Sequence, residues 1–316
     1  MKLDVAITSK CNLNCKHCYQ GKTNKLFIHE IPYSILKELI LQNIKKLKVN
    51  ELLITGGEPT QHSEFKKIIV LFKRIIKQYK IKITINTNGT QISKSLLELD
   101  AKYIISLDGP KKYHDFIRGY NAYNKTIKNI KKLKKYHRTV EIKCIITKDI
   151  NNWIEKFVND LKGIGIKKIT LNNIFQYGNA RQNFKNSKWV VNGVSETEKF
   201  YKKCAAIDSL IAINFDGVCY PCAFFRSLQF LSIGNIYCDN ITNIHKNAIK
   251  LASKWFINTK RCSPSCIVYK KCSCGCKCRS LLTYGDFKSP DPFQCIAKGK
   301  KINQNILDKI IQNNII

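Results

Sequence analysis

Short apolar runs alternate with longer amphipathic segments in the first part of the chain, and this order constrains the fold more than any other feature. The runs of strand type are residues 3–9, 51–55, 81–87, 102–108, 140–147 and 167–173. The segments of helical type are residues 33–48, 62–79, 91–99, 111–136 (broken near Gly119) and 151–162. Strands that alternate with helices form parallel βαβ units. Six such units predict an α/β fold, an incomplete (β/α)6 barrel of the TIM type, over residues 1–185.

Polar side chains occupy one face of two of these runs. Glu141 and Lys143 alternate with apolar residues such as Cys144, and Thr84 and Asn86 alternate with isoleucines. Because alternate residues of a strand point to opposite faces, the apolar face should meet the helices and the polar face should line the barrel interior. A polar interior predicts a barrel that holds a ligand. Cys144, on the apolar face, is expected to be a small buried hydrophobe.

Cysteine usage sets the second half of the chain apart. Eleven of the fifteen cysteines lie between Cys204 and Cys295, around an expected hairpin at Asp216-Gly217. We therefore expect a linker at 186–199 and a Cys-rich domain over 200–316, closed by a helix at about 300–313. The N-terminus lacks a signal peptide and no run is long enough to span a bilayer, which predicts a cytoplasmic protein. Disulfides are rare in that compartment, so metal or cluster ligation is expected.

The formal net charge of +33 raises the question of a nucleic-acid partner. The lysines are spread along the amphipathic segments, where a solvated helix face is the simpler interpretation. The remote alternative is a non-catalytic, basic metal-binding protein that binds nucleic acid through its Cys-rich end. It predicts aromatic residues among basic ones there, as at Trp255 and Tyr269, and leaves the motifs of the first half unexplained.

Three cysteines follow the first strand-type run in the pattern Cys11-x3-Cys15-x2-Cys18. Three thiolates in one loop can bind three irons of a 4Fe–4S cluster and leave the fourth iron open to a ligand. The loop also stands at the carboxyl end of a barrel strand, where the active sites of such barrels lie. The spacing and the position together predict a catalytic cluster.

Residues 10–20 (KCNLNCKHCYQ) and 55–60 (TGGEPT) resemble the radical S-adenosylmethionine (radical SAM) superfamily. The resemblance implies that Cys11, Cys15 and Cys18 bind a 4Fe–4S cluster whose open iron chelates the methionine end of S-adenosylmethionine. Electron transfer from the cluster then cleaves this cofactor to a 5′-deoxyadenosyl radical, which abstracts hydrogen from a substrate.

The same resemblance implies a set of cofactor-binding residues. They are His17, Gly56, Gly57, Glu58, Asn88, Ser106 and Arg118. His17 would lie near the adenine, Glu58 would accept from the methionine amino group, and Arg118 would clamp the carboxylate. Asn88-Gly89 and Asp108-Gly109 also fit ordinary turns, and for Asp108 both interpretations stay open. Residues 177–180 (YGNA) resemble the segment that follows the barrel in this family.

The C-terminal cysteines resemble a SPASM domain, which carries auxiliary 4Fe–4S clusters. By analogy, the ligands of the first auxiliary cluster are Cys204, Cys219, Cys222 and Cys276, and those of the second are Cys262, Cys266, Cys272 and Cys295. Cys274 or Cys278 could replace a member of either set. Zinc is the alternative for these thiols. Cys238 fits neither set, and a role as hydrogen-atom donor is one interpretation.

SPASM relatives mostly modify peptides or proteins, so the resemblance implies a ribosomally made peptide or protein as substrate, with a crosslink, oxidation or epimerisation as the change. A small molecule such as a tetrapyrrole side chain is the alternative. Sulfatase-maturing relatives have an Asp directly after the hairpin cysteine, where this chain has Ala223 after Cys222, which argues against that activity. The expected partner is a reductant such as flavodoxin or ferredoxin. A leader peptide would be recognised by a separate leader-peptide-binding protein or by the barrel itself.

Overall fold

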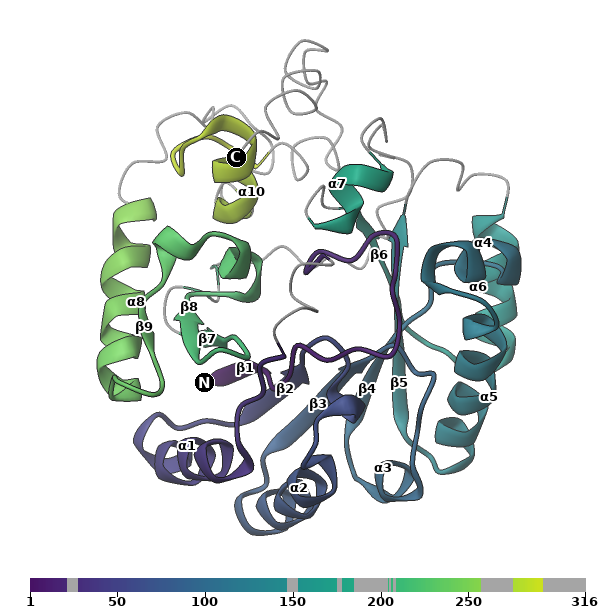
Figure 1. Ribbon diagram of the computed structural model, residues 1–316, viewed down its shortest axis with the longest axis horizontal. Helices are drawn as coiled ribbons and strands as arrows, with labels where there is room; N and C mark the ends of the chain where they lie inside the picture. The colour runs from purple at the N-terminus through teal and green to yellow at the C-terminus, as the bar shows by residue number, and fades with distance from the viewer. Residues whose placement is uncertain are drawn as a thin grey trace. The chain divides into compact units, whose positions relative to one another are not determined.

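The structure is a computed structural model (Figure 1). It describes residues 1–21, 28–146, 153–174, 178–184, 204, 206, 209–256 and 275–291. Two compact units make up the chain, the first comprising residues 1–190 and 212–218 and the second 191–211 and 219–316. The expected linker at 186–199 and the expected helix at about 300–313 lie outside the described residues, so the domain boundaries stay predictions.

The first unit contains the six predicted strands. They are β1 (Lys2–Ala6), β2 (Glu51–Thr55), β3 (Lys82–Thr87), β4 (Lys102–Ser106), β5 (Thr139–Ile146) and β6 (Ile169–Asn173). Each is parallel to the next along the chain, in the order β1 to β6. Parallel pairing requires a crossover between successive strands, and the amphipathic segments supply it. The predicted partial barrel is confirmed.

Helices form the crossovers of this sheet. They are α1 (Tyr33–Lys46), α2 (Phe65–Tyr79), α3 (Lys94–Glu98), α4 (Lys111–Arg118), α5 (Ala122–Lys135) and α6 (Ile154–Gly163). A one-turn 3₁₀ helix, η2 (Pro59–Gln61), precedes α2. The expected break near Gly119 separates α4 from α5, where the φ of Gly119 is 122°. Figure 1 shows α1, α2, α3 and α5 on one side of the strands, whereas the chain that follows β1 runs along the other.

Burial follows the alternation of β5. Val140, Ile142 and Cys144 are buried, while Glu141 and Lys143 are partly exposed. The apolar side chains therefore pack under the helices, and the polar ones occupy the opposite face, which we call the inner face. This arrangement agrees with the polar interior that the sequence predicts.

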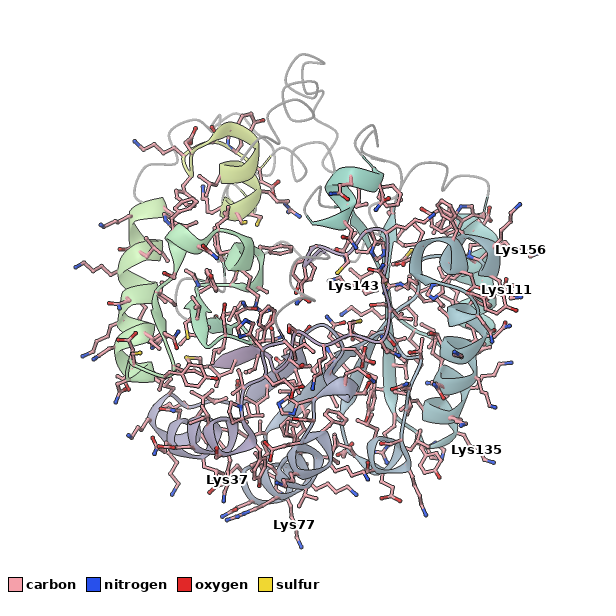
Figure 2. The ribbon with its side chains drawn as sticks, viewed as in Figure 1. Lys37, Lys77, Lys111, Lys135, Lys143 and Lys156 are labelled. Carbon is pink, nitrogen blue, oxygen red and sulfur yellow. The ribbon has the colours of Figure 1, made fainter. Side chains whose placement is uncertain are left out.

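The lysines of the helices lie on solvent-exposed faces, as expected for amphipathic crossovers. Figure 2 shows Lys37, Lys77 and Lys135 projecting outward from α1, α2 and α5. The positive charge is thus distributed over separate helices and does not define one binding face in the described structure. No helix among the described residues is long and apolar enough to cross a membrane.

The remaining elements are short apart from the 16-residue helix α8 (Ile241–Phe256). They are α7 (Asn179–Asn183), β7 (Leu210–Ile213), β8 (Val218–Tyr220), η4 (Ala223–Ser227), η5 (Gln229–Leu231), β9 (Gly234–Asn235), α8 (Ile241–Phe256) and α10 (Lys277–Tyr284). The hairpin expected at Asp216-Gly217 is the turn between β7 and β8, closed by the Asn214 amide, which donates to the Val218 carbonyl at 2.8 Å. The segment after β6, for which the sequence predicted no helix, contains the short helix α7.

Candidate active site

The loop that follows β1 carries the three cysteines of the Cys11-x3-Cys15-x2-Cys18 motif. Cys15 is 8% exposed, and Cys11 and Cys18 are partly exposed. Burial raises the pKa of the Cys15 thiol to about 11; the nearby Arg118 guanidinium opposes this rise, and Cys11 and Cys18 add to it. The three thiols therefore lie close enough to interact electrostatically, as ligands of one cluster must.

The Gly56-Gly57 pair holds this loop by close backbone contact. The Gly57 amide donates to the Thr8 carbonyl at 2.8 Å. A Cβ on Gly57 would lie 2.4 Å from the Lys10 carbonyl oxygen, and one on Gly56 would lie 2.5 Å from the Thr8 carbonyl oxygen. Only glycine permits this approach. The two glycines therefore allow the cysteine loop to pack against the end of β2. The sequence predicted them only as cofactor-binding residues and did not indicate this packing role.

Glu58 joins the ends of β2 and β3. Its buried carboxylate accepts from the Thr87 hydroxyl and from the Asn88 amide, both at 2.7 Å, and from the Thr60 hydroxyl at 3.0 Å. Burial raises the pKa of Glu58 above its ordinary value, although these hydrogen bonds oppose the rise. The Glu58 oxygen that faces Asn88 accepts only the hydrogen bond from the Asn88 amide among those named here, so it can accept a further hydrogen bond from another donor.

Asn88 is bound to the cysteine loop by its side chain. Its amide nitrogen donates to the Asn12 side chain at 2.8 Å, and its amide oxygen accepts from the Thr90 hydroxyl at 2.7 Å. Asn12 in turn donates to Thr90 at 2.9 Å. Asn12 was not among the residues predicted from the sequence, although a polar residue between two cysteines of the motif was the available signal.

Asp108 is the centre of a buried ionic network. Its carboxylate accepts from the Nε and one terminal nitrogen of Arg118, lies 2.9 Å from His17 Nε2, and accepts from the Ile145 amide at 3.0 Å. Burial alone would raise the pKa of Asp108, but Arg118 and His17 hold it well below its usual range. Asp108 is therefore more than a turn residue, because it fixes two of the predicted cofactor-binding side chains.

Arg118 and His114 complete this network. The other terminal nitrogen of Arg118 lies 4.0 Å from Cys15 Sγ, which connects the network to the cluster loop. His114 is fully buried, and its Nδ1 accepts from the Asp108 amide at 3.1 Å. Burial lowers the pKa of His114 to about 4, with Arg118 adding to the effect, so the ring is neutral at pH 7.

The YGNA segment contacts the cysteine loop directly. The Asn179 amide donates to the Cys18 carbonyl at 2.9 Å, and its side chain donates to the Cys15 carbonyl at 3.0 Å. Gly178 has φ 56°, and a Cβ there would lie 2.5 Å from the Cys18 and Tyr19 carbonyl oxygens. Tyr177 lies outside the described residues. The sequence resemblance placed this segment after the barrel, but it gave no indication of these contacts.

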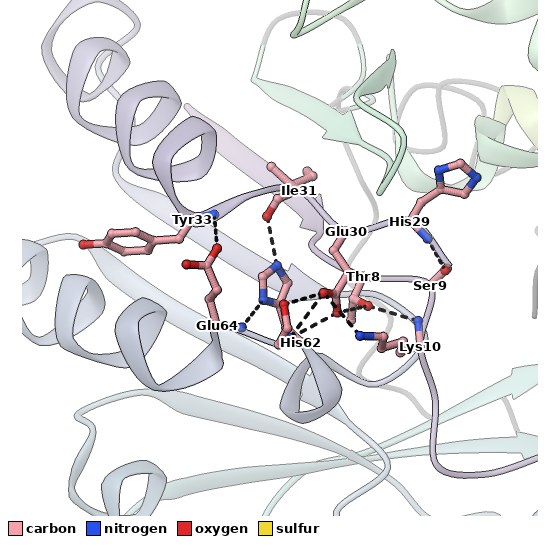
Figure 3. Close-up of polar contacts among 10 residues, drawn as sticks. Thr8, Ser9, Lys10, His29, Glu30, Ile31, Tyr33, His62 and Glu64 are labelled. Atoms are coloured by element: carbon pink, nitrogen blue, oxygen red, sulfur yellow. Dashed lines mark hydrogen bonds and ion pairs between the residues drawn. The ribbon is translucent and has the colours of Figure 1, made fainter. Parts of the chain in front are cut away.

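A second network braces the start of the loop from the side of α1 and α2 (Figure 3). Glu30 accepts from the Thr8 hydroxyl at 2.9 Å and from the Ser63 hydroxyl at 2.6 Å, and it pairs with Lys10 at 3.5 Å. The buried His62 donates from Nε2 to the Ile31 carbonyl at 2.9 Å. These contacts fix the backbone just before Cys11.

The donor set fits a cluster better than a single ion. Among the described residues, no three His, Cys, Asp or Glu side chains converge where one metal ion could bind. A 4Fe–4S cluster does not require such convergence, because each thiolate binds a different iron. Close by, at the end of β4, the Ser106 side chain makes no hydrogen bond to the rest of the described chain.

A second group of thiols lies in the second unit. The charges that act most strongly on the Cys222 thiol are those of Cys276 and Cys204, and Cys222, Cys276 and Cys204 all act on the Cys278 thiol. Burial raises the pKa of both Cys222 and Cys278. Cys219 is fully buried on β8, and Cys238 is exposed. The other cysteines of the predicted clusters, together with Cys274, lie outside the described residues.

Fold and site define a partial barrel whose first strand is followed by a loop with three cysteines. The pattern of the radical SAM superfamily matches residues 5–172, which is more than half of the chain. The chain belongs to this superfamily, and the resemblance inferred from the two motifs is confirmed. Its cofactors are a 4Fe–4S cluster and S-adenosylmethionine, and the non-catalytic nucleic-acid-binding alternative is set aside.

The similarity extends into the second unit. The radical SAM cyclopropyl synthase TigE of Paramaledivibacter caminithermalis is 25% identical over 345 residues, covering 93% of this chain and 71% of the relative. A cysteine-type anaerobic sulfatase-maturating enzyme of Clostridium perfringens is 26% identical, and the match covers 86% of this chain and 87% of that relative. The crystal structure of Streptococcus suis SuiB bound to the precursor peptide SuiA superimposes with a TM-score of 0.70 at 19% identity, over 92% of this chain and 74% of that one. These are relatives of the kind that the predicted SPASM subgroup implies.

Proposed function

We propose that this radical SAM enzyme modifies a ribosomally made peptide or protein, by crosslinking, oxidation or epimerisation. The proposal is supported by similarity to a sulfatase-maturating enzyme and to a structure that holds a precursor peptide. This similarity extends along both units and is not limited to the barrel. A barrel-only likeness would leave the substrate class open, because barrels of one fold serve many reactions.

The chain's own residues prepare the site for this chemistry. When bound, the cluster and S-adenosylmethionine supply a carbon-centred radical that removes hydrogen from the substrate. We propose that Cys11, Cys15 and Cys18 hold the cluster. Glu58 accepts from the methionine amino group at its less engaged oxygen, and Ser106 offers a free hydroxyl to the cofactor. His17 lies near the adenine and Arg118 binds the methionine carboxylate, and both side chains are held by Asp108. Asn88 completes the cofactor-binding set.

We further propose that one auxiliary cluster is bound by Cys204, Cys222, Cys276 and Cys278. Cys278 takes the place that the sequence analysis gave to Cys219, because it shares the electrostatic environment of the other three thiols. Replacement of Cys278 by Ser should lower the iron content of the reconstituted protein by about one cluster's worth, or about four irons. The matched Cys219→Ser variant should retain its iron. The reverse pattern would restore the original assignment.

The reaction is not expected to be sulfatase maturation, because Ala223 follows the hairpin cysteine. The reductant and the leader-peptide-binding partner stay predictions. The test is an anaerobic reaction of the reconstituted enzyme with S-adenosylmethionine, dithionite and a pool of unstructured synthetic peptides, run in D₂O with a Cys15→Ala control. A loss of 2 Da (a new bond) or a gain of 1 Da (an exchanged hydrogen) on a peptide supports the proposal. Turnover only in a parallel porphyrinogen reaction contradicts it.

A further inference from the structure

Helix α4 has a buried side and an exposed side, and the two sides have different neighbours. On the buried side lie Ile117 and Arg118, and one terminal nitrogen of Arg118 is 4.0 Å from Cys15 Sγ. Phe116 lies on the other side of the helix and is 59% exposed. A large apolar ring is therefore exposed to solvent on the same helix that contacts the cysteine loop.

Lys16 connects this ring to the cysteine loop. It stands next to Cys15 in the loop, and its backbone amide donates to the Ile117 carbonyl at 2.9 Å. Its ammonium lies 3.2 Å from the centroid of the Phe116 ring. An ammonium at this distance over an aromatic face makes a cation–π contact. The route from the exposed ring to the Cys15 thiol is therefore one side-chain contact followed by covalent bonds.

The surface around Phe116 is basic and aromatic. Lys112 is exposed and lies four residues earlier on α4, which places it on the same helix face. Tyr120, just after the helix, is 97% exposed. The acidic residue of this segment, Asp115, is directed elsewhere, because its carboxylate accepts from the Tyr123 amide at 2.7 Å. We define the α4 patch as Lys16, Lys112, Phe116 and Tyr120.

The composition of the α4 patch favours an acidic protein as its occupant. Lysines alone do not distinguish this face from those of α1, α2 and α5, but the two exposed rings do, because aromatic side chains are enriched at protein interfaces. A second copy of the chain is disfavoured, since each copy carries a formal net charge of +33. Two lysines are also few for a nucleic acid, whose binding depends on many phosphate contacts. An acidic partner matches the two ammonium groups.

We propose that the α4 patch is the docking surface of the protein that reduces the cluster, a small acidic electron carrier of the flavodoxin or ferredoxin kind. Position carries this choice, because Lys16 joins the patch to Cys15 and the cluster must receive one electron before it can cleave S-adenosylmethionine. In that step the carrier is oxidised by one electron and the cluster is reduced by one, and no bond is made or broken between the two proteins. The inference rests on the proposed binding of the cluster by Cys11, Cys15 and Cys18.

The test separates electron delivery by a carrier from reduction by dithionite, a small reductant that needs no docking surface. The reconstituted wild type is compared with Phe116→Ala and Lys112→Glu. The matched controls are Tyr136→Ala, at another exposed ring, and Lys66→Glu, at the corresponding second position of α2. Affinity for an oxidised flavodoxin and for an oxidised ferredoxin is measured by biolayer interferometry at low and high salt. Formation of 5′-deoxyadenosine is then measured with each reduced carrier and with dithionite.

Both patch variants should bind the carrier about tenfold more weakly and, at subsaturating carrier, form 5′-deoxyadenosine more slowly to the same extent. The loss in Lys112→Glu should shrink at high salt, because salt screens the attraction between charges, whereas the loss in Phe116→Ala should persist. With dithionite, both variants should match the wild type. The carrier that binds more tightly identifies the class of the partner.

The proposal is overturned if the patch variants bind both carriers as tightly as their controls, or if the wild type binds neither carrier. It is also overturned if dithionite-driven formation of 5′-deoxyadenosine falls as far as carrier-driven formation, or if the patch variants lose only the modification of a peptide, which would make the patch a substrate surface. An error in the cluster assignment has a different signature, since a Cys15→Ala variant would then keep its dithionite-driven activity.

Discussion

Replacing Asp108 by Asn tests whether the buried network stabilises the barrel. Asp108 is fully buried and pairs with Arg118, which is 7% exposed. The substitution keeps the shape of the side chain but removes its charge, and it directs an NH₂ group toward donors on Arg118, His17 or the Ile145 amide. Arg118 is then left as a buried charge without compensation.

Removing one partner of a buried ion pair costs about 3–5 kcal/mol of folding free energy. For a unit of this size, each kcal/mol lowers the melting temperature by about 2–4 °C, which predicts a decrease of about 6–20 °C. The control is Asp100→Asn, because the Asp100 carboxylate pairs with Arg138 at 3.1 Å but is 87% exposed. A surface pair of this kind contributes about 0–1 kcal/mol.

The assay is thermal unfolding of iron-free protein, followed by circular dichroism at several pH values. Since Asp108 has a depressed pKa in the folded state, its contribution is complete above the unfolded carboxyl pKa of about 3.9 and is lost as the pH falls below it. The difference between wild type and Asp108→Asn should therefore persist above about pH 5 and decrease as the pH falls through the range in which Asp108 becomes protonated. A melting temperature of Asp108→Asn that is lowered no more than that of Asp100→Asn would refute this prediction.

Two further predictions concern the cysteine loop. In Gly57→Ala the added Cβ would lie 2.4 Å from the Lys10 carbonyl oxygen, so this variant should displace the loop and lower the iron content after reconstitution. The control Gly163→Ala, which has no atom within 4 Å of its added Cβ, should retain the wild-type iron content. Equal iron content in the two variants would contradict the packing role of Gly57. In the iron-free protein, Cys15 should react with iodoacetamide at pH 8 far more slowly than the exposed Cys238, because its pKa is raised to about 11. Peptide mapping by mass spectrometry measures both rates, and equal labelling would show that Cys15 is not buried.

Much of the barrel could be predicted from local pattern. The six strands and the break at Gly119 follow from alternation, helical spacing and one glycine, which are properties of adjacent residues. The polar inner face of β5 followed from the same alternation. By contrast, α7 was missed because its segment is polar and short, so that its structure depends on contacts of Asn179 with a loop more than 160 residues away.

The site was predictable in its residue types and less so in its contacts. The motifs identified Cys15, Glu58 and Arg118 as members of one site. They did not show that Arg118 is directed at Asp108, nor that Asn12 connects the cysteine loop to β3. Such pairings depend on which strand ends meet across the sheet, and a single sequence does not contain that information.

The most direct test of the central claim is cofactor cleavage. The reconstituted enzyme is incubated without oxygen with S-adenosylmethionine and dithionite, and 5′-deoxyadenosine is quantified by mass spectrometry alongside a Cys15→Ala variant. The account predicts 5′-deoxyadenosine from the wild type and none from the variant. Wild-type protein that holds its iron and yields no 5′-deoxyadenosine, or a variant that yields as much as wild type, would contradict it.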